Sequence, residues 1–128
     1  MMYVWVALGS AIGGVMRYAI SRMMEPVSQG IPWGTIVVNI TGCFIIGFVF
    51  TISATEGRVF LSPLTRNFIT IGILGGYTTF SSFSLQTLTL AQDGQWAGAA
   101  ANVLLSVVLC LVGVWLGAML AGSLNQMR

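Results

Sequence analysis

The feature that most constrains this chain is a polar stretch inside an otherwise apolar segment, between Gly75 and Ser84. It opens with two glycines, continues through two threonines, and ends in phenylalanines and serines. Paired glycines and β-branched residues are poor helix formers. Because the hydrocarbon of a bilayer offers no water to exposed backbone groups, a helix break here must be buried in protein or line a polar cavity. We therefore expect a solute to meet the chain at this stretch.

Composition places the chain in a membrane. Only 6% of the 128 residues are charged and 56% are hydrophobic, whereas soluble domains typically carry about 25% charged residues. A net charge of +2 gives no basis for a nucleic-acid partner. There is no histidine, and the three acidic residues fall between the apolar segments, so no enzymatic activity is expected.

Four apolar segments are long enough to span a bilayer, which takes about 20 residues for roughly 30 Å of hydrocarbon. We therefore predict an all-α membrane protein with four transmembrane helices per subunit, in a single domain of residues 1–128. The first segment is long for a signal-peptide core and is interpreted as a retained span. The predicted spans are about 3–22, 33–54, 66–92 and 96–123.

Small residues in these spans predict how the helices pack. Glycines at four-residue spacing allow helix backbones to approach closely in lipid. The pairs are Gly9 with Gly13, Gly72 with Gly76, and Gly113 with Gly117. Cys43 and Cys110 lie in apolar runs, and we interpret them as small core residues rather than as disulfide or metal ligands.

The arginines give almost no orientation signal. With four spans, Arg58, Arg66 and Arg128 share the side of both termini, and Arg17 and Arg22 belong to the opposite side. Two interpretations stay open: a single weakly biased orientation, or dual topology with copies inserted both ways and paired antiparallel. Because four helices enclose little space, we expect a pore between subunits and hence an oligomer.

A break in the polar stretch would lie near the bilayer midplane, because residue 79 is the midpoint of the third predicted span. The first half of a broken helix ends in unpaired carbonyl oxygens with partial negative charge. The carbonyls from Gly75 to Thr78 are thus candidate ligands for sodium or a similar hard cation. The alternative is an unbroken helix whose threonines bond to carbonyls four residues earlier.

The side chains after the predicted break favour an anion. Phe80 and Phe83 share a helix face, and aromatic ring edges are electropositive. Ser81 and Ser84 form a hydroxyl row that could replace part of an anion's water shell. The alternatives are lipid-facing or core rings and hydroxyls that bond between helices.

The other polar residues inside the predicted spans are few and carry no negative charge. They are Asn39 in the second span, Asn102 and Ser106 in the fourth, and Arg17 in the first. A guanidinium near a pore mouth would concentrate anions, although its side chain could equally extend to the membrane interface.

Three motifs resemble the Fluc fluoride channels, also called CrcB proteins, in the order and spacing of that family. The stretch from Gly75 to Ser84 resembles its third-span signature. The second and first spans show supportive patterns, Trp33-Gly34-Thr35 with Val38-Asn39, and Gly13-Gly14-Val15-Met16-Arg17-Tyr18. The resemblance covers essentially the whole chain.

This resemblance implies a passive fluoride channel of the bacterial inner membrane, built as an antiparallel dual-topology homodimer with two pathways. It implies a third helix broken at mid-membrane and a structural sodium ion at the dimer centre, held by main-chain carbonyls of Gly75 and Thr78. It further implies a fluoride pathway along Phe80, Phe83, Asn39, Ser81, Ser84, Ser106 and Asn102, with Arg17 facing an aqueous vestibule.

The chain departs from the family pattern at Gln86, where many members carry glutamate, and at Asn102, where some have tyrosine. Cys110 and Val114 stand where some relatives have serine and threonine. Two other functions are alternatives for a chain of this size. A proton-coupled exporter of the small multidrug resistance type needs a membrane-embedded glutamate, which is absent here, and an assembly subunit would conduct nothing. Selectivity for fluoride over chloride rests on the resemblance alone.

Overall fold

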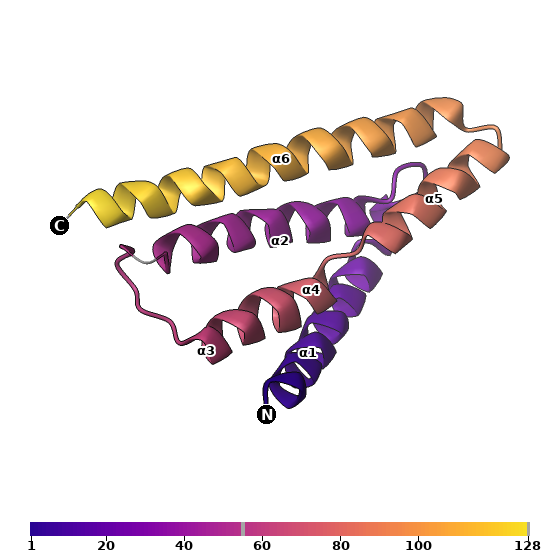
Figure 1. Cartoon of the computed structure of the whole chain (residues 1–128). Helices are drawn as coiled ribbons and strands as arrows, with labels where there is room; N and C mark the ends of the chain where they lie inside the picture. Colours follow the sequence, from indigo (N-terminus) through magenta and orange to yellow (C-terminus); the bar gives the residue numbers. More distant parts are fainter. Residues whose placement is uncertain (55, 128) are drawn as a thin grey trace.

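The structure is a computed structural model that describes residues 1–54 and 56–127 (Figure 1). Within these ranges every regular element is a helix and there is no strand. Four helical segments are long and apolar enough to cross a membrane: Met2–Met23, Trp33–Ile52, Pro63–Gln92 and Trp96–Gln126. The prediction of an all-helical chain with four apolar spans is confirmed. Two residues used in the predictions lie outside the described residues: Thr55, which is in the second connection, and Arg128, which was counted for the orientation.

The first, second and fourth segments are single helices. They are α1 (Met2–Met23), α2 (Trp33–Ile52) and α6 (Trp96–Gln126), and a short 3₁₀ turn, Glu25–Val27, follows α1. The third segment is composite. It consists of α3 (Pro63–Asn67), the π-helical turn η2 (Phe68–Ile73), α4 (Leu74–Tyr77) and α5 (Phe80–Gln92).

Local sequence explains where the third segment begins and how it turns into the fourth. Ser62 caps α3 by accepting a hydrogen bond from the Thr65 N–H, and Pro63 occupies the first helical position, where no N–H is needed. Gly94 connects α5 to α6 with a φ of 75°, which only glycine adopts at little cost.

Glycines bring the helices into backbone contact. In Figure 1, α2 runs beside α6, while α1 packs against η2 and α4. A Cβ on Gly117 would collide with the carbonyl oxygen of Phe44, and one on Gly76 would collide with that of Ser10. The close packing predicted from glycine spacing is therefore present between helices of the same chain.

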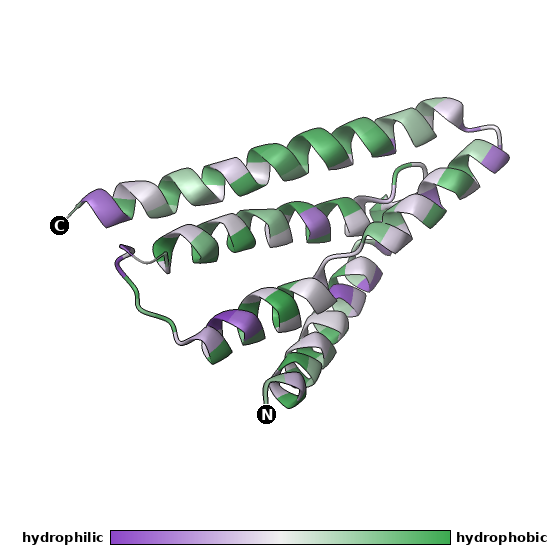
Figure 2. Cartoon of the chain, in the orientation of Figure 1, coloured by the Kyte–Doolittle hydropathy of each residue, from purple (hydrophilic) through white to green (hydrophobic). Residues whose placement is uncertain are grey.

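The outer surface is apolar, as expected of helices that face lipid. Figure 2 shows hydrophobic residues over most of α6, with hydrophilic ones gathered at its C-terminal end. Leu104, Leu111 and Trp115 of α6 are about 60% exposed, at 64%, 64% and 59%. A helix that is apolar all round is typical of a membrane span.

Candidate functional site

The candidate site surrounds two extended residues between α4 and α5. Thr78 has φ −79° and ψ 157°, and Thr79 has φ −153° and ψ 116°. The Thr78 N–H and hydroxyl both donate to the Leu74 carbonyl, at 3.0 and 2.9 Å. On the other side, Thr79 Oγ1 accepts from the Ser82 N–H at 3.1 Å and so caps α5.

Asn39 of α2 binds the main chain of Thr79 with both ends of its amide. Its Nδ2 donates to the Thr79 carbonyl at 3.0 Å, and its Oδ1 accepts from the Thr79 N–H at 2.8 Å. In a continuous helix this N–H would bond to the Gly75 carbonyl. That carbonyl has no hydrogen-bond partner among the bonds of the described residues, and Gly75 is exposed.

Arg17 of α1 donates a hydrogen bond to the neighbouring carbonyl, that of Gly76. Its Nε donates to the Gly76 carbonyl at 3.2 Å, and the side chain is partly buried. The C-terminal end of a helix carries partial negative charge, so a guanidinium is favourable there. Arg17 therefore supports the end of α4 rather than extending to the membrane interface.

A cavity of about 350 Å³, here named the central groove, opens beside the extended residues. Its walls come from α2, from η2 and α4, from α5 and from α6, and they are mainly apolar. The structure brings six of the predicted site residues to this groove: Asn39, Gly75, Thr78, Phe80, Phe83 and Ser106.

The two phenylalanines differ in exposure. Their ring centroids are 5.2 Å apart with an interplanar angle of 50°. Phe83 is 8% exposed and points into the molecule, whereas Phe80 is 77% exposed. Phe83 thus forms part of the groove wall, whereas the ring of Phe80 is exposed at the surface of the chain.

A line of polar side chains leads away from the groove between α5 and α6. The Ser106 hydroxyl donates to Asn102 Oδ1 at 3.3 Å, and Asn102 Nδ2 donates to Thr87 Oγ1 at 2.8 Å. Asn102 is fully buried, so these two bonds satisfy it in an apolar surrounding. Two predicted residues lie outside the line: Ser81 and Ser84 are exposed on α5.

Sequence reasoning missed a second polar contact at this site. The Tyr77 hydroxyl lies 2.8 Å from Thr41 Oγ1 and links the end of α4 to α2. Gly42 is also required, because a Cβ there would collide with the Thr78 methyl group. The available signal was spacing: Gly42 follows Asn39 by three residues and so shares its helix face.

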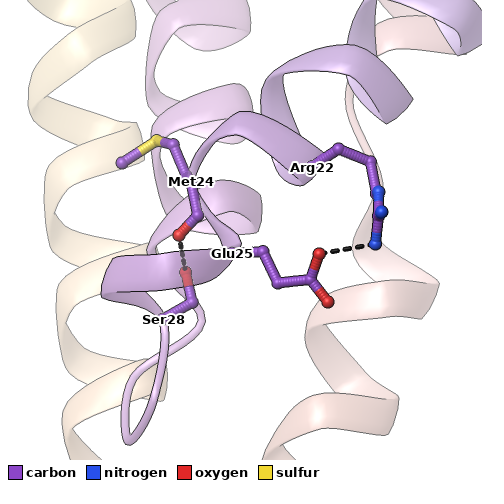
Figure 3. A network of polar contacts seen from close by, with 4 residues as sticks. All are labelled: Arg22, Met24, Glu25 and Ser28. Atoms are coloured by element: carbon purple, nitrogen blue, oxygen red, sulfur yellow. Dashed lines mark hydrogen bonds and ion pairs between the residues drawn. The ribbon is translucent and has the colours of Figure 1, made fainter.

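A second cavity of about 260 Å³, with several polar residues in its lining, lies where α1 ends. Arg22 and Glu25 form an exposed ion pair at its edge, 2.5 Å apart, and Ser28 donates to the Met24 carbonyl nearby (Figure 3). Gln86 Oε1 is buried here and accepts no hydrogen bond from the described protein atoms. Gln86 thus contributes a neutral acceptor to the cavity that Arg22 and Glu25 also line.

The chain is similar to a known protein family over nearly its whole length. The family model described as CrcB-like protein, Camphor Resistance (CrcB), matches residues 4–118. The "Fluoride-specific ion channel FluC" of Opitutus terrae is 51% identical over 128 residues, which cover 99% of this chain and 97% of that protein. The protein of the same name from Rhodospirillum rubrum is 53% identical over 127 residues, covering 98% of each chain.

These findings confirm the resemblance that the three motifs suggested. Ion channels are transport proteins, so the prediction that the chain is not an enzyme is also confirmed. Together with the four apolar helices, the matches indicate a multi-pass membrane protein. The chain belongs to the CrcB-like family.

Proposed function

We propose that this chain forms a fluoride-selective channel that exports cytoplasmic fluoride passively across the inner membrane of a bacterial cell. The names of its relatives support fluoride as the transported ion, and the central groove supports a route for it along the protein. The observation that carries the proposal is the pair of extended residues, Thr78 and Thr79, which opens the helix backbone onto a groove that also contains Phe83 and Ser106.

The channel unit in this proposal is a homodimer of oppositely inserted copies, with the interruption between α4 and α5 at mid-membrane depth. Two features support it. The exposed Phe80 and Gly75 lie on the groove, where a second copy would cover them. In addition, the arginine distribution gives neither orientation a clear advantage.

A structural sodium ion at the dimer centre fits the donor set. The Gly75 carbonyl has lost its helical partner among the described residues, and the Thr78 carbonyl follows directly after the end of α4. Unwound backbone carbonyls are the ligands that membrane proteins use for sodium. The Gly75 and Thr78 carbonyls of both copies would hold the ion, whose positive charge would tie the two copies together.

Fluoride would travel along hydrogen-bond donors and ring edges. Phe83 presents its ring to the groove, and the hydroxyl of Ser106 begins the line through Asn102. Ser81 is exposed next to Thr79, and Ser84 lies one turn after Phe80. None of these groups is negatively charged, and Arg17 adds a positive charge near the interruption. This set suits a small anion and gives a proton-coupled exporter no carboxylate to use.

Ion efflux from proteoliposomes tests the proposal. Purified protein should release fluoride much faster than chloride, and replacing sodium by a large organic cation should reduce dimer formation and flux together. Equal release of both anions would end the claim of selectivity. Release of neither would favour the assembly-subunit alternative. A crosslinking assay on the same protein reports the dimer independently of flux.

A further inference from the structure

Two thiols meet in the central groove. Cys43 of α2 and Cys110 of α6 are free cysteines, and each is partly exposed. Both line the groove, and each stands one turn before a residue of the Gly47–Val114 contact between their two helices, so they lie opposite each other. Neither thiol has a role in the proposed passage of fluoride.

The helices that carry these thiols are held in backbone contact around them. A Cβ on Gly113, one turn after Cys110, would lie 3.2 Å from the Ile40 carbonyl oxygen. One turn beyond Cys43, a Cβ on Gly47 would collide with the Val114 carbonyl oxygen. The thiols therefore face each other on two helices that cannot separate without losing this packing.

We propose that Cys43 and Cys110 form a two-coordinate site for a soft divalent cation of the mercuric type. Thiolate sulfur favours soft metal ions. A linear site needs two sulfurs roughly 4.6 Å apart, twice a metal–sulfur distance of about 2.3 Å. In the described part of the chain, no group of three or more histidine, cysteine or acidic residues could complete a tetrahedral site.

Charge balance selects the divalent ion. Each thiol loses its proton to water in the groove, and the two thiolates together neutralise one divalent cation. A monovalent ion would leave a net negative charge between apolar helices, which costs free energy in a low-dielectric medium. The filled site is neutral, as the empty one is.

An ion held there would obstruct the groove, because the same cavity contains Phe83 and Ser106. This consequence, unlike the site itself, rests on the proposed function. The site can therefore be tested by binding alone, and obstruction by flux.

The binding test uses reduced, detergent-purified protein treated with mercuric chloride, desalted and weighed intact by mass spectrometry. We expect one mercury per subunit in the native chain, and loss of both free thiols to a thiol reagent. The matched variants Cys43→Ala and Cys110→Ala should retain no mercury after a wash with a competing monothiol. Cys110→Ser, which keeps nearly the same volume, should behave like Cys110→Ala. Two mercury ions per native subunit, or retention by either single variant, would overturn the paired site.

The flux test compares each protein with itself in the presence and absence of mercuric chloride. We expect fluoride release by the native chain to fall at least about tenfold, because thiolates hold a soft ion tightly and a groove filled by the ion excludes fluoride. The ratio for Cys43→Ala should stay near one. Undiminished flux in native protein that carries one mercury would refute obstruction of the groove, but it would not contradict the metal site itself. An absence of flux before treatment would count against the proposed function, while the mass measurement would still decide the site.

Discussion

Asn39 and Thr79 are joined by two hydrogen bonds, one from each end of the asparagine amide, at 3.0 and 2.8 Å. Asn39 Oδ1 thus takes the place of the Gly75 carbonyl as the partner of the Thr79 N–H, and Nδ2 adds a bond to the Thr79 carbonyl. A freed backbone group in an apolar medium costs free energy unless another group pairs with it. The Asn39 amide therefore stabilises the interruption between α4 and α5.

Replacing Asn39 by aspartate should destabilise the protein and suppress fluoride flux. The carboxylate keeps an acceptor for the Thr79 N–H but places a negative oxygen against the Thr79 carbonyl. Loss of the hydrogen bond from Nδ2, together with the repulsion between the two oxygens, costs about 1–3 kcal/mol. Thermal unfolding in detergent and fluoride efflux from proteoliposomes measure the two effects.

Asn125 provides a matched control for this substitution. Its Nδ2 donates to the Thr51 carbonyl at 3.1 Å and its Oδ1 accepts from the Arg58 N–H at 2.8 Å. The same two-bond arrangement thus occurs far from the groove, at the C-terminal end of α6. Asn125→Asp should lower stability and leave flux intact. Equal losses of flux in both variants would show that the effect is general unfolding.

The sequence predicted the architecture well because the membrane constrains it strongly. Apolar length alone identified all four spans, although α2 ends at Ile52 instead of Ala54 and the third helical segment begins at Pro63 instead of Arg66. The differences lie at helix ends, where capping by Ser62 decides the boundary. The π-helical turn from Phe68 to Ile73, which packs against α1, was not predicted from the sequence.

Six of the predicted site residues line the central groove, but the sequence did not predict the contacts that they make. Asn39 was predicted to lie on the fluoride pathway and Arg17 to face an aqueous vestibule. The structure adds that both bond to main-chain atoms next to the interruption. Such contacts join residues 40 and 59 positions apart in the chain, and periodicity reports only neighbours on one helix. The contact between Tyr77 and Thr41 was missed for the same reason, whereas the spacing of Gly42 from Asn39 could have indicated its place on the same helix face.

Arg17 should not tolerate replacement by lysine. The bond to the Gly76 carbonyl comes from Nε, and a lysine ammonium lies one bond farther along its side chain, so it does not reproduce this contact. We expect Arg17→Lys to lose about 1.5–3 kcal/mol of stability, the value for a hydrogen bond from a charged group. Arg22→Lys is the control, because Arg22 is exposed and pairs with Glu25 at the surface. Full flux in Arg17→Lys would mean that only the charge matters.

The two phenylalanines should respond differently to replacement by isoleucine. Phe83 is buried, so Phe83→Ile should cost about 1–3 kcal/mol of stability as well as flux. Phe80 is exposed, so Phe80→Ile should suppress flux with little change in unfolding temperature. Phe60→Ile, at a ring that is 93% exposed outside the groove, should change neither. Unchanged flux in both Phe80→Ile and Phe83→Ile would contradict a role of these rings in the fluoride pathway and would indicate that they serve packing only.

Gly13 and Gly14 are adjacent in α1, yet an added methyl group should have opposite effects at the two positions. A Cβ on Gly13 would collide with the Ile73 carbonyl oxygen and lie 2.7 Å from the Tyr77 nitrogen, whereas one on Gly14 would meet nothing within 4 Å. Gly13→Ala should therefore push α4 away from α1, at a cost of about 1–3 kcal/mol, and reduce flux by displacing Thr78. Gly14→Ala should stabilise the helix by roughly 0.5–1 kcal/mol and leave flux unchanged. Unfolding in detergent and fluoride efflux distinguish the pair, and similar behaviour of the two variants would contradict the packing of α1 against α4.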